Sequence, residues 1–334
     1  MVSSGMGAKR GILIRKGEAI QTMKEIKTIV FDKTGTLTKG KPEVTDVKSF
    51  DKSINEKELL NLSANLEKLS EHPIAKAIVN KADLKSYKKV NGFKVLRGRG
   101  VEGKIGKDMI TIGNQTLMKE RKIDLGNFVK SVEKLEEDGK TTMMVAEGKK
   151  ILGVIAVADS VKEDSKEAIR RLNKAGYRTV MITGDNERTA KAIAKQVGIK
   201  EVIANVLPEY KAKKVEELQK NGMVAFVGDG INDAPALKQS NVGIAMGTGT
   251  DIAIEAGDIV LAKGSLEGVV QSINLSKATF RKIKQNLFWA FAYNVIAIPL
   301  AVAGVLHPVI AEVAMALSSV TVVTNANLLR RKKI

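Results

Sequence analysis

The sequence predicts an α/β protein in which a parallel sheet is interrupted by an inserted α+β domain and followed by a helical membrane hairpin. Short apolar runs alternate with helical patterns along residues 18–270, which is typical of parallel strands joined by helices. This alternation of strand and helix patterns is interrupted between residues 38 and 152. Residues 287–306 carry no charged side chain. These features distinguish a central sheet, an inserted lobe and a membrane segment.

Three apolar runs closed by polar residues or glycine are expected to form strands of the parallel sheet: Ile26–Phe31, Thr179–Ile182 and Met223–Val227. Helical patterns lie between them, for example over 164–174 and 189–197. We therefore expect one domain built from residues 18–37 and 153–270, preceded by an N-terminal connector over residues 1–17.

Residues 38–152 are expected to form a second, inserted domain, because they follow a helix-then-strand order of their own. Within this range, Lys104–Ile112 alternates apolar and polar side chains, as a half-exposed strand does. The insertion is therefore predicted to combine helices with a separate sheet.

The last part of the chain, residues 271–334, is predicted to be a membrane hairpin. Its first span, Leu287–Leu306, is 20 residues long without a formal charge, enough to cross about 30 Å of hydrocarbon. A break at His307-Pro308 separates it from a second span over 309–329. Basic residues flank only the outer ends: Lys282, Lys284, Arg330, Arg331, Lys332 and Lys333. This pattern places both termini in the cytoplasm; the alternative is a buried helical hairpin of a water-soluble protein.

Composition narrows the classes of partner. The formal net charge is +18, but lysine is spread along the whole chain, and aromatic residues make up only 4%. That is too sparse for a base-stacking platform, so nucleic acid is not an expected partner. The chain contains 0 Cys, which excludes disulfides, thiolate metal sites and cysteine nucleophiles.

Each of the three apolar strands is followed directly by residues suited to phosphate. The three segments are Asp32–Thr36, Thr183–Asp185 and Gly228–Asp233. Because ligands of open α/β sheets bind beyond the carboxyl ends of the strands, these segments are expected to meet in one crevice. A carboxylate such as Asp32 can attack phosphorus to give an aspartyl-phosphate, and Asp229 fits a Mg²⁺ ion that screens the two anions from each other. Any of these acids alone would more often be a cap or turn residue; their combination predicts phosphoryl transfer.

The residues DKTGTLT at 32–38, MITGDN at 181–186 and VGDGINDAPAL at 227–237 resemble the three phosphorylation-domain motifs of P-type cation-transporting ATPases, which are haloacid dehalogenase-like enzymes. The resemblance implies that Asp32 is the phosphorylated nucleophile and that Mg²⁺ is bound by Asp32, Asp229 and the backbone carbonyl of Thr34. It also implies further phosphate-site residues: Thr183, Gly184, Asp185, Asn232, Asp233 and Lys211, whose charge neutralises the phosphate. Without the family, Lys211 would be read as part of a solvated, lysine-rich helix face.

The inserted domain carries a second resemblance. Ser70-Glu71-His72-Pro73 is similar to the Ser-Glu-His-Pro motif of the nucleotide-binding domain of heavy-metal P-type ATPases, which implies ATP with Glu71 and His72 at the adenine. The family also places Gly98, Gly100 and Asn114 at the nucleotide site. Taken alone, His72-Pro73 would be a helix-start turn. Residues 98–103 also spell a dinucleotide motif, but a strand pattern follows where that motif requires a helix.

The predicted spans carry a clue to the transported ion. Tyr293-Asn294 and the pair Met315 and Ser319 resemble motifs of the copper(I)-transporting branch. Met315 and Ser319 share a helix face, and a thioether suits a soft ion such as Cu⁺ or Ag⁺. The alternative is a lipid-facing Met315 with serines packed between helices. The Asp-Gly pair of the zinc-type branch is absent here, which favours Cu⁺ over zinc; Glu312 receives no role.

The resemblance runs from about residue 5 to 331 but covers only the C-terminal half of the family. A complete pump of this branch has six preceding spans with a Cys-Pro-Cys motif, and an actuator domain with a Thr-Gly-Glu motif; neither motif occurs here. We therefore expect the catalytic half of an ATP-driven Cu⁺/Ag⁺ exporter, embedded in the lipid bilayer of the cell membrane, whose partner is the missing N-terminal half. Alone, it is expected to bind ATP and become phosphorylated without pumping.

Three alternatives remain: a fragment of a zinc-type P-type ATPase, a regulatory nucleotide-binding subunit, or a haloacid dehalogenase-like phosphatase. Phosphatases of that group usually have a second Asp two positions after the nucleophile, where this chain has Thr34. A Thr there suits a long-lived phosphoenzyme better than rapid hydrolysis.

Overall fold

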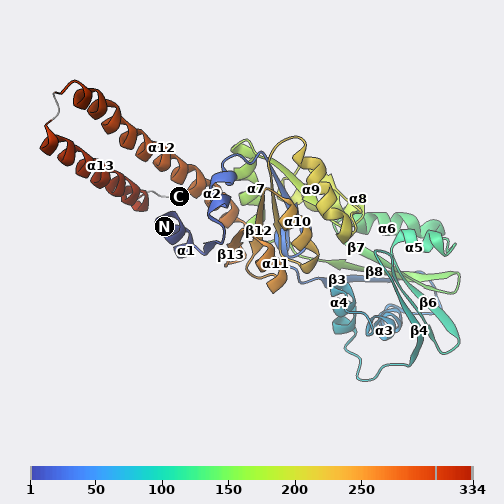
Figure 1. Ribbon diagram of the computed structural model, residues 1–334. Coiled ribbons are helices and arrows are strands. Elements are labelled where there is room, and N and C mark those ends of the chain that lie inside the picture. Colours follow the sequence, from blue (N-terminus) through green and yellow to red (C-terminus); the bar gives the residue numbers. More distant parts are fainter. Residues whose placement is uncertain (1, 305–306, 332–334) are drawn as a thin grey trace. The chain divides into compact units, whose positions relative to one another are not determined.

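The computed structural model describes residues 2–304 and 307–331 (Figure 1). Its contacts divide the chain into two compact units, the first made of residues 1–29, 171–178 and 212–334 and the second of residues 30–170 and 179–211. The division passes through strand β2 (Thr28–Asp32), whose last three residues belong to the second unit. The domain boundaries expected from the sequence stay predictions.

The first unit contains strands in the order β1-β13-β12-β11. Their bounds are β1 (Ile12–Ile14), β11 (Val224–Gly228), β12 (Val242–Met246) and β13 (Ile259–Leu261). The last three are parallel, whereas β1 pairs with β13 in antiparallel register. Every residue of β11, β12 and β13 is buried, as expected for parallel strands covered on both faces. The short helices of this unit are α1 (Val2–Lys9), α2 (Gly17–Met23), α9 (Lys211–Gln219, from its second residue), η4 (Ile231–Asp233), α10 (Ala234–Gln239) and α11 (Asp251–Ala256).

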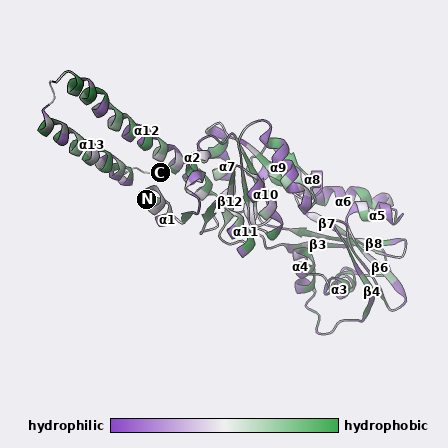
Figure 2. Ribbon diagram, in the orientation of Figure 1, coloured by the Kyte–Doolittle hydropathy of each residue, from purple (hydrophilic) through white to green (hydrophobic). Residues whose placement is uncertain are grey.

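Two long helices of the first unit, α12 (Glu267–Val302) and α13 (Pro308–Leu328), lie side by side, and the turn η5 (Leu329–Arg331) follows (Figure 1). The start of α12 packs against α2, and Leu275 and Ala278 of α12 are buried against Met6 of α1 and Leu329 of η5. Toward its C-terminal end, α12 exposes large apolar side chains. In Figure 2, green marks the hydrophobic residues of this part of α12 and of α13.

Within the described ranges, α12 is the one helix long and apolar enough to cross a membrane, and none of its most apolar stretch is buried. The alternative of a hairpin buried in a water-soluble core is therefore not supported for α12. The second predicted span largely coincides with α13, and its crossing of a membrane stays a prediction.

The second unit contains an antiparallel sheet in the order β3-β8-β7-β6-β5-β4. Its strands are β3 (Glu43–Ser49), β4 (Val90–Leu96), β5 (Gly100–Ile105), β6 (Asp108–Gly113), β7 (Thr141–Glu147) and β8 (Lys150–Ala158). Its helices are α3 (Glu56–Glu67), α4 (Pro73–Ala82), α5 (Gln115–Glu120), η2 (Gly126–Phe128) and α6 (Val129–Glu137). The single strand expected over residues 104–112 is wrong: Gly106, at φ 65°, permits a tight turn that splits this stretch between β5 and β6.

Helices cover both faces of this sheet (Figure 1). Because neighbouring residues of a strand point to opposite faces, Val145 and Ile155 pack with α3 and α4, whereas Met144 and Val154 pack with α5 and α6. The inserted domain is thus an independently cored α+β lobe, called the nucleotide lobe below and comprising β3–β8 with α3–α6.

The second unit also contains a strand-helix-strand segment. Strand β9 (Arg178–Ile182, from its second residue) leads through α8 (Glu187–Val197) to the parallel strand β10 (Glu201–Ile203). Helix α8 begins at the N-cap Asn186 and ends at Gly198, whose φ of 87° only glycine adopts readily. Helix α7 (Ser165–Lys174) precedes β9, and the turn η3 (Pro208–Tyr210) precedes α9. The strands and helices predicted around residues 164–197 are therefore confirmed.

Candidate active site

Strand β2 ends at Asp32, whose carboxylate accepts a hydrogen bond from a lysine far along the chain. The distance from Lys211 Nζ to Asp32 Oδ1 is 2.7 Å. Both residues are buried, with 5% of Asp32 and 8% of Lys211 exposed. Buried charges persist only when they are paired, so this contact fixes both side chains. The alternative reading of Lys211 as part of a solvated helix face is wrong.

The loop after Asp32 is held by a network of buried and partly buried hydrogen bonds. Although residues 33–37 form one helix-like turn, Thr34 and Gly35 have non-helical angles, and Gly35 lies at φ 71°. The backbone N–H of Gly35 donates to Thr38 Oγ1 (3.2 Å), and this hydroxyl donates to Asp159 Oδ2 (2.6 Å). Lys162 Nζ donates to the carbonyl of Gly35 (2.7 Å). The loop is therefore rigidly shaped beside the end of β2.

A second ion pair joins Lys33 of this loop to Asp185, and the side chains of both residues are largely buried. Lys33 Nζ is 2.5 Å from Asp185 Oδ2. Burial alone would lower the pKa of Lys33, but the Asp185 carboxylate outweighs it and holds that pKa above its ordinary value. Burial would likewise raise the pKa of Asp185, but Lys33 outweighs it and holds that pKa below its ordinary value. Both groups are thus charged at neutral pH.

Asp185 also forms hydrogen bonds with two neighbouring threonines. Its carboxylate accepts hydrogen bonds from Thr141 Oγ1 of β7 (3.1 Å) and from Thr183 Oγ1 (3.3 Å), while its N–H donates to Thr183 Oγ1 (3.1 Å). Thr141 belongs to the nucleotide lobe, so Asp185 ties that lobe to the end of β9. The three predicted residues Thr183, Gly184 and Asp185 therefore form one turn, with the Asp185 side chain engaged by Lys33.

In the first unit, strand β11 ends in the tight turn that carries Asp229 and Asp233. The carboxylate of Asp233 accepts hydrogen bonds from the N–H groups of Asp229 (3.3 Å) and Gly230 (3.1 Å). Asp233 is 1% exposed, Asp229 is half-buried and Asn232 is exposed. A Cβ on Gly249 would lie 2.2 Å from the Asp229 carbonyl, so glycine is required there. Asp233 thus shapes the turn that presents Asp229.

His72 and Glu71 differ in how the nucleotide lobe holds them. His72 is the N-cap of α4: its Nδ1 accepts the N–H of Ile74 (3.2 Å), and Pro73 occupies the first helical position. Glu71 is exposed. His72 is exposed, but the protein around its imidazole keeps part of the water away and thereby lowers its pKa, against the opposing attraction of Asp185, so the imidazole is neutral at pH 7. With Nδ1 occupied, Nε2 is the nitrogen left for a ligand. The helix-start turn, which was the alternative reading of His72-Pro73, is present, and the contact of His72 with adenine stays a prediction.

Gly98, Gly100 and Asn114 lie in closely packed surroundings, and Leu207, which lies outside the nucleotide lobe, packs against Gly98. A Cβ on Gly100 would lie 2.0 Å from the carbonyl oxygen of Ile112, and one on Gly98 would lie 2.4 Å from Leu207 Cδ2. Asn114 Nδ2 donates to the Gly98 carbonyl (2.8 Å), and Asn114 Oδ1 caps α5 through Leu117 N–H (3.0 Å). These residues therefore contribute to the packing and helix capping of the lobe, and their contacts with nucleotide stay predictions.

The predicted ion ligands of the hairpin bond within their own helices. Asn294 Nδ2 donates to the Ala290 carbonyl (2.9 Å), and Ser319 Oγ donates to the Met315 carbonyl (3.3 Å). The Met315 side chain is 70% exposed. The side chain of Tyr293 lies outside the part of the chain that the structure describes in detail. Among the side chains that the structure does describe, no hydrogen bond joins Asn294 to Met315 or Ser319.

Sequence reasoning missed three polar groups of the second unit. Lys33 was not singled out, yet it forms the pair with Asp185. Thr36 Oγ1 is buried without a hydrogen-bond partner among the described residues, so it is a group that a bound oxyanion would satisfy. Glu67, at the end of α3, is 2% exposed, and burial raises its pKa to about 7. The motif 32–38 offered a signal for Lys33 and Thr36; for Glu67 the signal was its place on the apolar face of α3.

Comparisons with known proteins agree with this geometry. The sequence pattern of the haloacid dehalogenase-like hydrolase family matches residues 26–241, and a second pattern of the same description matches residues 210–273. The chain is 50% identical over its whole length to a copper-exporting P-type ATPase of Staphylococcus haemolyticus and 49% identical to copper-transporting ATPase 2 of Rhizobium meliloti. It spans 42% and 41% of the length of these two relatives.

Solved structures of metal-transporting ATPases are also similar to this chain. A zinc-transporting PIB-type ATPase matches with a TM-score of 0.72 and 37% identity, covering 98% of this chain and 54% of that one. The catalytic domain of the CPx-ATPase CopB-B matches with a TM-score of 0.62 and 30% identity, covering 82% of this chain and 98% of that one. The chain therefore belongs to the haloacid dehalogenase-like hydrolase family and, within it, to the heavy-metal P-type ATPases.

Proposed function

We propose that this chain is the catalytic part of a metal-exporting P-type ATPase, which takes phosphate from ATP onto Asp32 and exports Cu⁺ or Ag⁺. The observation that carries the proposal is the buried contact between Asp32 Oδ1 and Lys211 Nζ at the end of β2, at 2.7 Å. A carboxylate that attacks a phosphoryl group brings two anions together. A fixed, desolvated ammonium beside the carboxylate offsets that repulsion and stabilises the charge of the transition state.

In the proposed step, a carboxylate oxygen of Asp32 forms a bond to the γ-phosphorus of ATP. The bond from that phosphorus to the bridging oxygen breaks, and ADP leaves with the electron pair. The product is an acyl phosphate on Asp32, with Lys211 still beside it. The rigid loop of residues 33–38 and the Thr183–Asp185 turn would hold the phosphoryl oxygens, and the unpaired hydroxyl of Thr36 is a further donor.

The donor set fits Mg²⁺ as the resident cofactor. The carboxylates of Asp32 and Asp229 and the backbone carbonyl of Thr34 are the hard oxygen ligands that Mg²⁺ prefers. Thr34, at φ −74° and ψ 129°, lies in a loop rather than a helix, where a carbonyl can serve as a ligand. When bound, Mg²⁺ supplies charge screening between carboxylate and phosphate. Asp233 would act on this set indirectly, by shaping the Asp229 turn.

The nucleotide lobe would hold the base of ATP. His72 is neutral at pH 7 and keeps Nε2 for a hydrogen bond or its ring for stacking, and the attraction of Asp185 indicates that it lies near the Lys33–Asp185 pair. The exposed Glu71 and the packed trio of Gly98, Gly100 and Asn114 are the further proposed contacts. Their pre-formed hydrogen bonds support a lobe that binds nucleotide without first reorganising.

Cu⁺ is the proposed transported ion, with Tyr293, Asn294, Met315 and Ser319 as candidate ligands. The soft thioether of Met315 and the copper-named relatives at 49–50% identity support this choice. Zinc is the second candidate, because the zinc-transporting structure is 37% identical. The exposed apolar half of α12 supports a place in the cell membrane, and the positive flanks support cytoplasmic termini. The proposed partner is the N-terminal half that the longer relatives have beyond this chain, which the family resemblance implies to contain an actuator domain and the preceding spans.

Phosphorylation of Asp32 provides the decisive test. Wild-type chain incubated with γ-labelled ATP and Mg²⁺ should carry an acid-stable label, and Asp32→Asn should carry none while binding ATP within about twofold of wild type, because the base is held in the nucleotide lobe. Asp108→Asn, an exposed acid of β6, is the matched control and should label normally. Label on Asp32→Asn would place the nucleophile elsewhere, and an unlabelled wild type would favour a regulatory nucleotide-binding subunit. Rapid release of phosphate from assorted phosphate esters would favour a phosphatase.

The ion is tested after the N-terminal half is supplied. Phosphorylation should then be stimulated by Cu⁺ and lose that stimulation in Met315→Ala and Ser319→Ala. Stimulation by Zn²⁺ that both substitutions leave unchanged would replace copper by zinc.

A further inference from the structure

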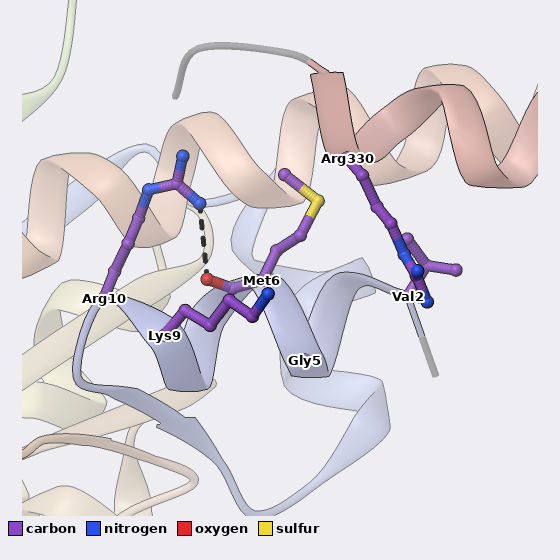
Figure 3. A pocket seen from close by; sticks show the side chains of 6 residues that line it. All are labelled: Val2, Gly5, Met6, Lys9, Arg10 and Arg330. Carbon is purple, nitrogen blue, oxygen red and sulfur yellow. Dashed lines mark hydrogen bonds between the residues drawn. The ribbon is translucent and has the colours of Figure 1, made fainter.

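A cavity of about 520 Å³ lies in the first unit between α1 and η5, at the base of the helical hairpin. Six residues line it: Val2, Gly5, Met6, Lys9, Arg10 and Arg330 (Figure 3). Two segments from opposite ends of the chain therefore build one cavity, which no part of the proposed phosphoryl-transfer chemistry uses.

The lining carries three cations and no carboxylate. No acidic side chain within residues 2–304 and 307–331 forms an ion pair with Lys9, Arg10 or Arg330. Arg10 Nη1 donates to the Met6 carbonyl at the end of α1 (3.3 Å), which orients its guanidinium. Figure 3 shows Lys9 and Arg10 on one side of Met6 and Arg330 on the other. Three positive charges around one cavity attract an anion with several oxygens, such as a phosphate.

The cavity also has an apolar wall. Met6 is 6% exposed and packs with Leu275, Ala278 and Leu329, and Val2 packs against the same cluster. A free inorganic anion would gain nothing from contact with this apolar wall. A combination of cations and apolar surface matches the junction between the headgroup and the acyl chains of a phospholipid.

The cavity lies beside the base of the predicted span. Ala278 borders the cluster, and the predicted span begins at Leu287, roughly 13 to 14 Å further along a helix that rises 1.5 Å per residue. The polar layer on one side of a bilayer is about 5 to 7 Å thick, and the long side chains of lysine and arginine extend toward it from such a position.

We propose that α1 and η5 form a binding site for the headgroup phosphate of an anionic phospholipid, held by Lys9, Arg10 and Arg330 at the cytoplasmic surface. The proposal goes beyond the phosphoryl-transfer chemistry and depends only on the membrane placement of α12. Because β1 follows α1 directly and pairs with β13, a lipid seated here would brace the edge of the first unit's sheet against the bilayer.

The test measures lipid retention by the full chain. The chain is purified in mixed micelles, titrated separately with phosphatidylglycerol and phosphatidylcholine, and examined by native mass spectrometry. Wild type should retain one phosphatidylglycerol in preference to phosphatidylcholine. Lys9→Gln and Arg330→Gln should each weaken retention about fivefold, and the double variant roughly 25-fold, as expected from about 1 kcal/mol per basic residue near a membrane surface. Lys9→Arg should retain the lipid.

The matched control is Arg281→Gln, which removes an exposed charge of α12 at the same membrane surface but outside the cavity. It should change retention less than twofold, and thermal unfolding should show that all variants are folded. Equal weakening by Arg281→Gln would indicate diffuse attraction and overturn the proposal. An unchanged double variant, or displacement of the lipid by millimolar inorganic phosphate, would overturn it as well.

Discussion

The loop of residues 32–38, called the phosphate loop here for its proposed role, and the helical hairpin hold their polar motif residues in opposite ways. Asp32 meets Lys211 across 179 residues of sequence, Gly35 meets Lys162 across 127, and both contacts are buried or partly buried. In the hairpin, Asn294 and Ser319 bond carbonyls only four residues earlier, on exposed helix faces. Tertiary contacts within this chain therefore pre-organise the loop, whereas the candidate ion ligands have no such support within the described part of the hairpin.

The difference indicates which parts of the chemistry this chain can perform alone. A site fixed by long-range buried contacts is ready before its substrate arrives. A helix whose polar groups bond their own backbone is stable in a membrane but does not define a coordination geometry. Long-range polar contacts of the hairpin occur at its basic end, where Asn325 accepts from Lys282 (2.6 Å) and donates to Asn286 (2.7 Å). These contacts fix the register of α12 and α13 rather than an ion site.

The largest expected effect follows from breaking the long-range contact of the loop. Lys211→Met keeps the length and apolar stem of the side chain but removes the ammonium beside Asp32. We expect the rate of phosphorylation by ATP to fall by about 10²–10³, the usual loss when one fixed group that stabilises transition-state charge is removed. Quenched-flow labelling with γ-labelled ATP measures this rate.

Lys213→Met, an exposed lysine on the same helix, is the control and should label at the wild-type rate. Similar rates for Lys211→Met and wild type would show that the buried contact has no part in the chemistry. The long-range buried contacts that distinguish the loop from the hairpin would then have no effect on phosphoryl transfer.

Glu67 of the nucleotide lobe is buried as deeply as Asp32, but burial is the only cause of the shift in its pKa. Burial raises the pKa of Glu67 from 4.5 to about 7, whereas its lysine partner lowers the pKa of Asp185. Between pH 4.5 and 7 the folded state therefore holds a proton on Glu67 that the unfolded state has lost. The free energy of unfolding must then fall as pH rises through this window, by about 3 kcal/mol in total.

Glu67→Gln keeps the shape of the side chain and removes the titration. Urea unfolding followed by circular dichroism at pH 5 and pH 8 should show a decline of about 3 kcal/mol in wild type that is largely absent in the variant. The variant should thus be more stable than wild type at pH 8 and similar to it at pH 5. Equal pH dependence in both proteins would mean that Glu67 is ionised in the folded state.

The strand ends were predictable from sequence because the signal is local. An apolar run followed by Asp32 or by Thr183-Gly184-Asp185 specifies both a strand and its polar end, and β2 and β9 end where these patterns do. The partners of these groups were less accessible. Lys211 was identified only through the family motif, since its own helix reads as solvated, and no local pattern links Lys33 to Asp185.

The glycines show why the rest requires the fold. The family resemblance places Gly98 and Gly100 at the nucleotide site, but the carbonyl of Ile112 by itself excludes a side chain at Gly100. Similarly, the alternation over residues 104–112 suggests one strand, because a two-residue turn at Gly106 preserves the period of two. In both cases the deciding contact joins a neighbouring strand, which a single sequence window does not contain.

The smallest expected effect lies in the hairpin. Ser319→Ala removes a hydroxyl that donates to the carbonyl of Met315 on its own helix, a bond whose loss frees no buried group. We expect the thermal stability of the full chain in detergent to change by less than about 0.5 kcal/mol, and labelling of Asp32 by ATP to stay at the wild-type rate. Ser318→Ala, one residue earlier on a different face, is the matched control. A large loss of stability in Ser319→Ala alone would show that its face makes tertiary contacts, and the candidate ligands would then be pre-organised in the same way as the phosphate loop.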